Sequence, residues 1–117
     1  MTMPDKTQLF LEKFKGDFEK MKTSAPEMVK GFGGLFQSIM KDGALKKKEK
    51  ELVALGIAVA QRCEPCINLH VQKSLEAGNS PAEILEAASV AVMMQGGPAY
   101  THIPVVIDAL ESLAPKT

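Results

Sequence analysis

The apolar run from Leu52 to Ala60 constrains the fold more than any other feature of the sequence. It is far shorter than the roughly 18 residues that a membrane span needs. The residues before it, Lys46 to Glu51, are mostly charged and typical of the solvated start of a helix, which we expect to continue to about Arg62. A helix that is apolar nearly all round is normally buried. We therefore predict that this segment is the central helix of the domain.

Helical periodicity, with residues typical of helix starts and ends, continues through the rest of the chain. Further helices are expected over residues 5–22, 24–42, 63–77, 81–95 and 98–114, the last restarted near Pro104. Ser24 and Ser80 each open an S-x-x-E capping box with a proline in the first turn. No useful stretch alternates apolar and polar residues, as a half-buried strand would. The predicted fold class is therefore all-α, with about six helices joined by short loops.

Length and composition indicate one domain. We expect a single domain over residues 1–117, whose first segment, 1–22, is an N-terminal amphipathic helix. The 14 basic and 14 acidic side chains cancel, which argues against nucleic acid or a membrane as partner. The N-terminus shows no apolar secretory segment, so we expect a cytoplasmic protein. In that compartment two close cysteines indicate catalysis or metal binding rather than a permanent disulfide.

Both cysteines, in Cys63-Glu64-Pro65-Cys66, fall where a helix is expected to begin. Helix N-terminal amides and the helix dipole favour a thiolate, and the thiolate is the reactive form of cysteine. His70 lies one turn beyond Cys66 on the same helix face, where an imidazole can take the thiol proton directly or through a water. Cys63 is further from His70, so spacing pairs His70 with Cys66. These residues indicate a redox-active thiol site.

The role of Glu51 and two other interpretations of the cysteines remain open at this point. Spacing alone favours an ordinary solvent-exposed glutamate at Glu51. A zinc site could use Cys63, Cys66 and His70, but it lacks a fourth ligand, and His102 is better explained as a polar residue near a helix start. The cysteines could also be buried and inert in a structural or redox-responsive oligomer that is not an enzyme.

The combined pattern resembles one known family, the alkylhydroperoxidase D-like branch of the carboxymuconolactone decarboxylase superfamily. The residues that carry the resemblance are, in order, Glu51, eleven intervening residues, Cys63-x-x-Cys66, three more residues, His70 and Gly78. The likeness covers roughly Ser24 to Leu113 and includes the K-D-G-A-L and G-G-P-A segments. It implies an all-helical, alkylhydroperoxidase D-like bundle that assembles into homo-oligomers, often trimers or hexamers.

The resemblance also implies a function. In that family the second cysteine, Cys66 here, attacks the peroxide and becomes a sulfenic acid, and the first, Cys63, resolves it to a disulfide. Glu51 and His70 would relay the proton, and this cysteine chemistry needs no metal or flavin. The implied activity is that of a thiol-dependent peroxidase or disulfide reductase. Its substrate would be a small peroxide or disulfide, and its electron donor a thiol such as a lipoylated protein or another dithiol.

Two departures narrow what the resemblance implies. Pro65 stands where alkylhydroperoxidase D itself has a histidine, and that protein is longer, with a second similar helical half. Its particular partners, a lipoylated protein and a peroxiredoxin, are therefore not transferred as a pair. The decarboxylase that names the superfamily lacks the Cys-x-x-Cys pair, so a lactone decarboxylase is disfavoured here.

Overall fold

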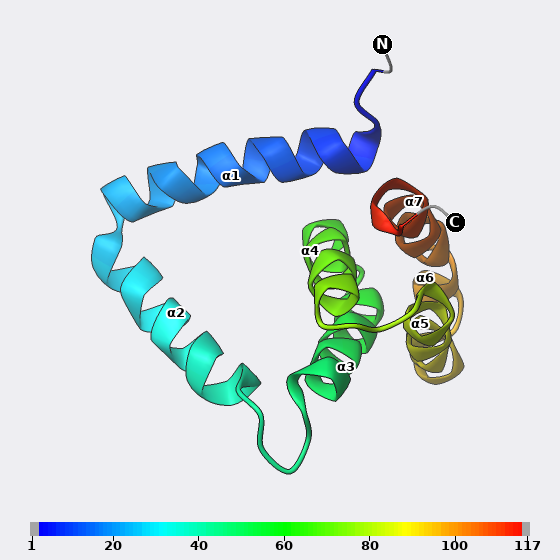
Figure 1. Cartoon of the computed structure of the whole chain (residues 1–117). Coiled ribbons are helices and arrows are strands. Elements are labelled where there is room, and N and C mark those ends of the chain that lie inside the picture. The colour runs from blue at the N-terminus through cyan, green and yellow to red at the C-terminus, as the bar shows by residue number, and fades with distance from the viewer. Residues whose placement is uncertain (1–2, 116–117) are drawn as a thin grey trace.

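The computed structural model describes residues 3–115 and is all-α over that range, as predicted (Figure 1). Its helices are α1 (Lys6–Ser24), α2 (Pro26–Met40), α3 (Lys47–Ala60), α4 (Glu64–Glu76), α5 (Pro81–Gln95), α6 (Gly97–Tyr100) and α7 (Ile103–Leu113). The element beyond the expected number is α6, a helix of 4 residues that precedes the restart at α7. Residues 1–2 of the predicted first helix, and 116–117 of the predicted domain, lie outside the described residues.

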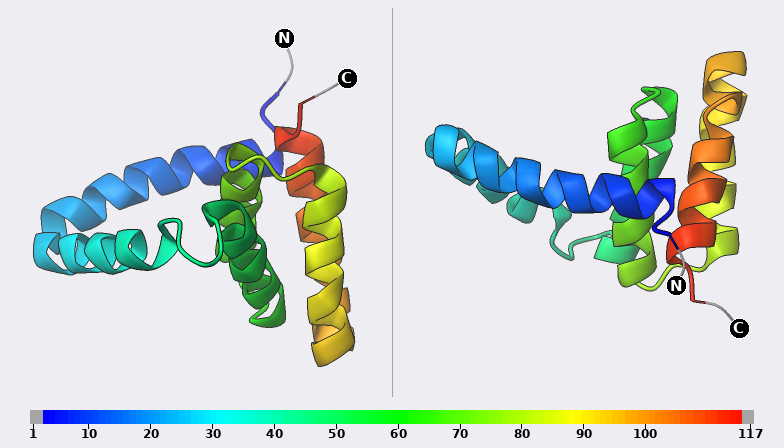
Figure 2. Two further views of the ribbon diagram at one scale, coloured as in Figure 1. Left: turned by 60° about the horizontal axis from the view of Figure 1, so that its bottom comes forward. Right: turned by 90° about the horizontal axis from the view of Figure 1, so that it is seen from above.

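The hydrophobic core lies among α3, α4, α5 and α7. Helix α3 packs against both α4 and α5, and α4 packs in turn against α7. Figure 2 shows these helices together at one end of the molecule, from which α1 and α2 extend. The largest fully buried apolar side chains come from all of them: Leu55, Val59, Ile67, Val71, Ile84 and Val106. These apolar side chains hold together the two helices, α3 and α4, that carry the predicted site.

The apolar run forms the central helix, as predicted, because α3 packs against both α4 and α5, but in the single chain it is buried on one side only. Leu55 and Val59 are fully buried, but Val53 and Ile57 on the other side of α3 are 53% and 56% exposed. The facing helix α5 likewise exposes Val90, at 55%. The burial therefore follows one face of each helix, as in an ordinary amphipathic packing, and leaves a second apolar face open.

Helices α1 and α2 form an arm that projects from the core and returns to it (Figure 1). At its start, the Asp5 side chain caps α1 and accepts a hydrogen bond from Ser112 Oγ of α7 (2.9 Å). At its end, Lys50 Nζ of α3 donates to the carbonyl oxygens of Ile39 (2.7 Å) and Lys41 (2.8 Å). Within the described chain no residue of α2 is buried. The arm is thus fixed at its two ends rather than along its length.

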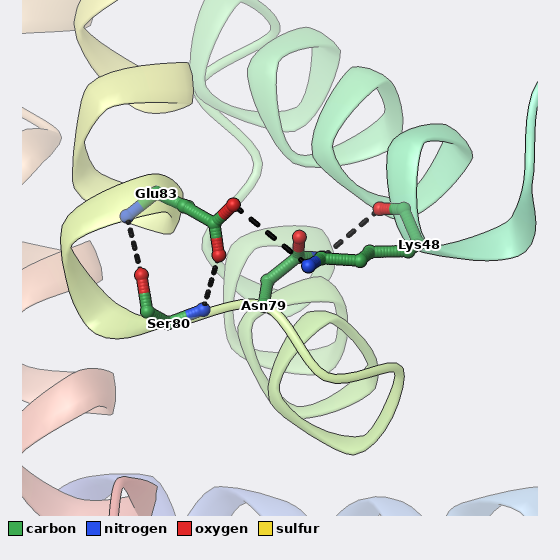
Figure 3. Close-up of polar contacts among 4 residues, drawn as sticks. All are labelled: Lys48, Asn79, Ser80 and Glu83. Atoms are coloured by element: carbon green, nitrogen blue, oxygen red, sulfur yellow. Dashed lines mark hydrogen bonds and ion pairs between the residues drawn. The ribbon is translucent and has the colours of Figure 1, made fainter.

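The two predicted capping boxes have different outcomes. At Ser80 the box forms: Glu83 N–H donates to Ser80 Oγ (3.1 Å), and Ser80 N–H donates to Glu83 Oε1 (2.8 Å; Figure 3). At Ser24 the prediction is wrong, because α1 continues through Ser24 and the N-cap of α2 is Ala25, which makes no side-chain cap. Tertiary context, here the continuation of the preceding helix, overrides the local pattern.

Helix α4 ends close to the predicted boundary at residue 77. The N–H of Gly78 donates to the carbonyl of Leu75, and the N–H of Asn79 donates to that of Ser74, both at 3.0 Å. Gly78 has a φ of 102°, the left-handed conformation of a helix-ending Schellman motif. Asn79 Nδ2 then donates to the carbonyl of Lys48 (2.9 Å), which ties this end of α4 to the start of α3 (Figure 3). Within residues 3–115 no helix has the length and apolar character needed to cross a membrane.

Candidate active site

A tight backbone turn after α3 brings Cys63 to the start of α4. The N–H of Arg62 donates to the carbonyl of Val59 (3.0 Å), and the N–H of Cys63 donates to that of Ala58 (3.1 Å). This is again the Schellman pattern, but Arg62 occupies the left-handed position, with φ 56°. A non-glycine residue there costs about 1–2 kcal/mol. The packing of α3 against α4 therefore holds a strained turn directly beside the cysteines.

Cys63 and Cys66 are joined by a disulfide across the first turn of α4, with their Cα atoms 5.3 Å apart. Cys63 is the N-cap residue, and its Sγ accepts a hydrogen bond from the backbone N–H of Cys66 (3.3 Å). Both cysteines are partly exposed. A small reagent can therefore reach the pair, and the helix N-terminus would stabilise negative charge on Cys63 Sγ once the disulfide is reduced.

Glu51 and His70 form a hydrogen-bonded pair between α3 and α4. Glu51 Oε1 lies 2.8 Å from His70 Nδ1, the side chain of Glu51 is fully buried, and that of His70 is 18% exposed. The exposed position that spacing alone favoured for Glu51 is thus wrong. Because α3 and α4 fold back on one another across the Arg62 turn, a residue near the start of α3 meets one in the middle of α4. A protonated Nδ1 donates to the carboxylate, which leaves Nε2 as the free nitrogen of the imidazole.

Three buried polar atoms between α3 and the end of α4 have no hydrogen-bond partner among the described residues. They are Glu51 Oε2, Ser74 Oγ and Asn79 Oδ1. Ser74 lies one helical turn beyond His70 on α4, so it faces the same side of that helix. Buried polar atoms without partners are costly and rare in folded proteins. One of them, Glu51 Oε2, belongs to the carboxylate that binds His70.

Two residues that sequence reasoning had not assigned to the site lie beside it: Phe36, from the arm, and Lys73, from α4. The ring of Phe36 in α2 stacks on the imidazole of His70, with centroids 6.5 Å apart and an interplanar angle of 21°. Lys73 Nζ lies 5.2 Å from the centroid of the Phe36 ring. From the sequence, Phe36 is only one of several apolar residues of the helix expected over residues 24–42. No local signal shows that α2 returns to α4, so this contact requires the tertiary structure.

The remaining histidine lies apart from this site. His102 is the N-cap residue of α7, and its Nδ1 lies 2.8 Å from the carbonyl oxygen of Pro98. It is thus a polar residue at a helix start, as predicted. No group of three or more His, Cys, Asp or Glu side chains in the described part of the chain has the arrangement of a metal site. The donor set of Cys63, Cys66 and His70 considered from the sequence therefore does not form one in this structure.

The structure thus brings together the four residues singled out from the sequence, Glu51, Cys63, Cys66 and His70. The fold and the site together define a small all-helical protein that carries a disulfide pair at a helix start, one turn from an imidazole backed by a buried carboxylate.

Comparison with known proteins identifies the family. The model of the carboxymuconolactone decarboxylase family matches residues 26–103, which is more than half of the chain. The chain therefore belongs to the carboxymuconolactone decarboxylase family. Its Cys-x-x-Cys pair is consistent with the alkylhydroperoxidase D-like branch.

Solved structures show the same fold over nearly the whole chain. A crystal structure of an apo carboxymuconolactone decarboxylase family protein from Legionella pneumophila is 35% identical, with a TM-score of 0.90, over 95% of this chain and 99% of that one. A family member from Thermotoga maritima, for which a part in the antioxidative response has been suggested, is 30% identical, with a TM-score of 0.78, over 89% of this chain and 88% of its own.

Two similar sequences belong to proteins described as uncharacterized. An uncharacterized protein of the cox locus of Paracoccus denitrificans is 34% identical over 82 residues, 70% of this chain and 74% of its own. An uncharacterized protein from Cupriavidus necator is 28% identical over 113 residues, 97% of this chain and 98% of its own. The comparisons thus establish family and fold, and the activity has to be argued from the site.

Proposed function

We propose that the protein is a thiol-dependent peroxidase or disulfide reductase of the alkylhydroperoxidase D-like kind. The observation that carries the proposal is the buried Glu51–His70 hydrogen bond, one helical turn from a partly exposed Cys63–Cys66 pair. A purely structural disulfide has no need of an imidazole and a buried carboxylate beside it. A carboxylate that orients an imidazole, which in turn serves a nucleophile, is the arrangement of activated nucleophiles in enzymes.

The first step of the proposed reaction oxidises Cys66. His70 accepts the proton of the Cys66 thiol, and Glu51 stabilises the imidazolium. The thiolate attacks one oxygen of a hydroperoxide, so that an S–O bond forms and the O–O bond breaks. The leaving alkoxide takes the proton back from His70. The products are an alcohol and the sulfenic acid of Cys66, and the proton has moved from thiol to alcohol.

The next steps close and reopen the disulfide. The Cys63 thiol gives up its proton, and its thiolate attacks the sulfur of the Cys66 sulfenic acid. The S–S bond forms, the S–O bond breaks, and the leaving hydroxide takes up the proton lost by Cys63 and departs as water. The hydrogen bond from the Cys66 amide favours the thiolate that this step requires at Cys63. A dithiol donor then reduces the disulfide by thiol exchange and becomes a disulfide itself. The donor thereby supplies the two electrons that the peroxide has taken.

The proposal includes a compartment, an electron donor and an assembly. A dithiol cycle of this kind suits a reducing compartment, so we propose a cytosolic protein. The donor is a thiol compound or protein that carries a dithiol, such as a lipoylated protein. The homo-oligomer, a trimer or hexamer by the family resemblance, is supported by the apolar side chains that the single chain leaves exposed on α2, α3 and α5.

The test is peroxide consumption with dithiothreitol or dihydrolipoamide as reductant. The wild-type protein should turn over, and Cys66→Ser should abolish consumption because it removes the nucleophile. Cys63→Ser should still react with peroxide, but it should be unable to form the Cys63–Cys66 disulfide. Activity that is lost in Cys63→Ser and kept in Cys66→Ser would refute the assignment of roles. Absence of peroxide and disulfide turnover in the wild type, with slow alkylation of both thiols at neutral pH, would refute the enzymatic function.

A further inference from the structure

We infer that Phe36 is a positioning residue for His70. We also infer that Lys50 holds Phe36 in place by binding the end of α2. The inference concerns the orientation of the imidazole, so its main test needs no activity. Its kinetic consequence rests on the proposed function.

The Phe36 ring packs against the imidazole in an offset stack and shields part of one face of it. The Phe36 ring lies 6.5 Å from that of His70, centroid to centroid and inclined by 21°, within the range of a stacked aromatic pair. Phe36 is partly buried, although its neighbour on the same helix, Phe32, is 65% exposed. His70 is therefore fixed from two directions: by Glu51 along the Nδ1 bond and by Phe36 on the face of the ring.

Lys73 adds a second attachment for the same phenyl ring. Its Nζ lies 5.2 Å from the centroid of Phe36, within the range of a cation–π contact. Lys73 is three residues beyond His70 on α4, so both side chains project toward the same ring from adjacent turns. Phe36 is thus held against α4 by two contacts, one of which is the imidazole itself.

The position of Phe36 depends on how α2 ends. No residue of α2 is buried within the described chain, so packing along the helix does not fix it. Lys50 Nζ instead binds the carbonyl oxygens of Ile39 and Lys41, at 2.7 and 2.8 Å, where the last turn of a helix leaves carbonyls unpaired. A cation there also interacts favourably with the helix dipole. Phe36 lies one turn before this attachment.

The contacts that fix the end of α2 and that hold His70 start from adjacent residues of α3. Lys50 fixes the end of α2, and the next residue, Glu51, binds His70. The two contacts thus connect α2, α3 and α4 around the imidazole. Loss of either Phe36 or Lys50 leaves the Glu51 hydrogen bond in place but uncovers the face of the ring. The consequence is an imidazole that turns more freely and is open to water.

The test is a two-dimensional ¹⁵N–¹H spectrum of the histidine rings in the oxidised protein. His70 and His102 are the only histidines of the chain, so two ring systems account for the whole spectrum. In the wild type, the His70 Nδ1 proton should exchange slowly with water and the ring should hold one tautomer. Phe36→Ala should accelerate the exchange roughly two- to tenfold, the effect of losing one aromatic contact. Phe36→Leu, which keeps apolar bulk over the ring, should recover part of the protection.

Matched variants distinguish a loss of positioning at His70 from a general destabilisation of the fold. Lys50→Met should also accelerate exchange of the His70 Nδ1 proton. If Phe36→Ala does not fold, the result with Lys50→Met tests the inference in its place. Met28→Ala shortens an exposed apolar side chain about two turns from Phe36 on the same helix and should leave His70 unchanged, and the His102 signals should not move in any variant. Wild-type exchange and a single tautomer at His70 in both Phe36→Ala and Lys50→Met would overturn the inference.

The kinetic readout distinguishes this inference from the proposed function. If the protein is the proposed peroxidase, Phe36→Ala should lower kcat more than it raises KM, because a misoriented imidazole slows proton transfer rather than binding. A wild-type protein that consumes neither peroxide nor disulfide, with a His70 signal that still responds to Phe36→Ala, would refute the function and leave the positioning role standing.

Discussion

Glu51 occupies a costly place for a carboxylate. It is fully buried, one oxygen bonds to His70, and the other has no partner among the described residues. Burial of an acid with an unsatisfied oxygen destabilises a fold unless something else is gained. A functional role explains the cost, because a buried carboxylate both orients the imidazole and stabilises its protonated form.

Glu51→Gln tests that role at the residue scale. The amide keeps the shape and can accept the hydrogen bond from Nδ1, but it no longer stabilises an imidazolium. Peroxide consumption should fall by roughly 10²-fold, the usual contribution of an acid–base group, while the fold is retained. Steady-state kinetics and circular dichroism measure the two effects, with the surface variant Glu12→Gln as control. Wild-type turnover in Glu51→Gln would remove Glu51 from the mechanism.

Residue spacing could predict only part of this site. The pairing of Cys66 with His70 follows from one helical turn, so it needed no structure. The burial of Glu51 depends on which face of α3 meets α4. That is set by the turn at Arg62, where no glycine marks the left-handed residue. The sequence therefore located the thiols and the imidazole, while the position of the carboxylate rested on family resemblance until the fold was known.

At the scale of elements, the same sequence pattern gives two outcomes. Ser80 and Ser24 both begin an S-x-x-E box that contains a proline, yet only Ser80 caps a helix. Gly78 and Asn79 end α4 before Ser80, so the chain is free to start a new helix there. No such break precedes Ser24, and α1 runs on to it. Helix type, and every helix except the short α6, was predictable from periodicity, whereas boundaries depended on what the preceding helix does.

Ser80→Ala should therefore destabilise the protein, and Ser24→Ala should not. Loss of an N-cap hydroxyl typically costs about 1 kcal/mol, and the exposed hydroxyl of Ser24 makes no cap. Urea denaturation of the two variants measures the difference. Equal losses of stability in both would show that the assignment of the two caps is wrong.

The stability that the Ser80–Glu83 capping box contributes depends on pH. Hydrogen bonds from the backbone N–H and then the hydroxyl of Ser80, with a smaller contribution from the charge of Lys48, hold the pKa of Glu83 below its ordinary value (Figure 3). A lowered pKa in the folded state adds stability at neutral pH that is lost as the pH falls through that lowered pKa. In Ser80→Ala the pKa of Glu83 should rise, but only part of the way, because the backbone N–H remains. A carboxyl NMR titration measures it.

At the scale of the whole molecule, the chain exposes more surface than a compact monomer. Its accessible surface is 7940 Å², against about 6200 Å² expected for a compact protein of 12.6 kDa. Its radius of gyration is 14.8 Å, against about 13.4 Å for this length. The excess comes with the projecting arm of α1 and α2 (Figure 1). It also comes with an open apolar groove between α3 and α5, lined by Val53, Ile57, Val90 and Met94 among others.

We therefore expect the protein in solution to be a homo-oligomer that covers these apolar faces. Sedimentation equilibrium should give a mass that is a multiple of 12.6 kDa. Ile57→Lys should shift the mass toward the monomer, because it places a charge in the groove, whereas Glu12→Lys on the arm should not. A wild-type protein that sediments as a monomer at micromolar concentration would contradict the proposed assembly.

The central claim is that Cys66 is the thiol that reacts with peroxide, and trapping of its sulfenic acid tests it most directly. Reduced Cys63→Ser, which cannot close the disulfide, is mixed with one equivalent of an organic hydroperoxide and dimedone, and the adduct is located by peptide mass spectrometry. We predict a dimedone adduct on Cys66 in this variant and none on Cys63 in reduced Cys66→Ser. An adduct on Cys63 in Cys66→Ser, with no adduct in Cys63→Ser, would contradict it.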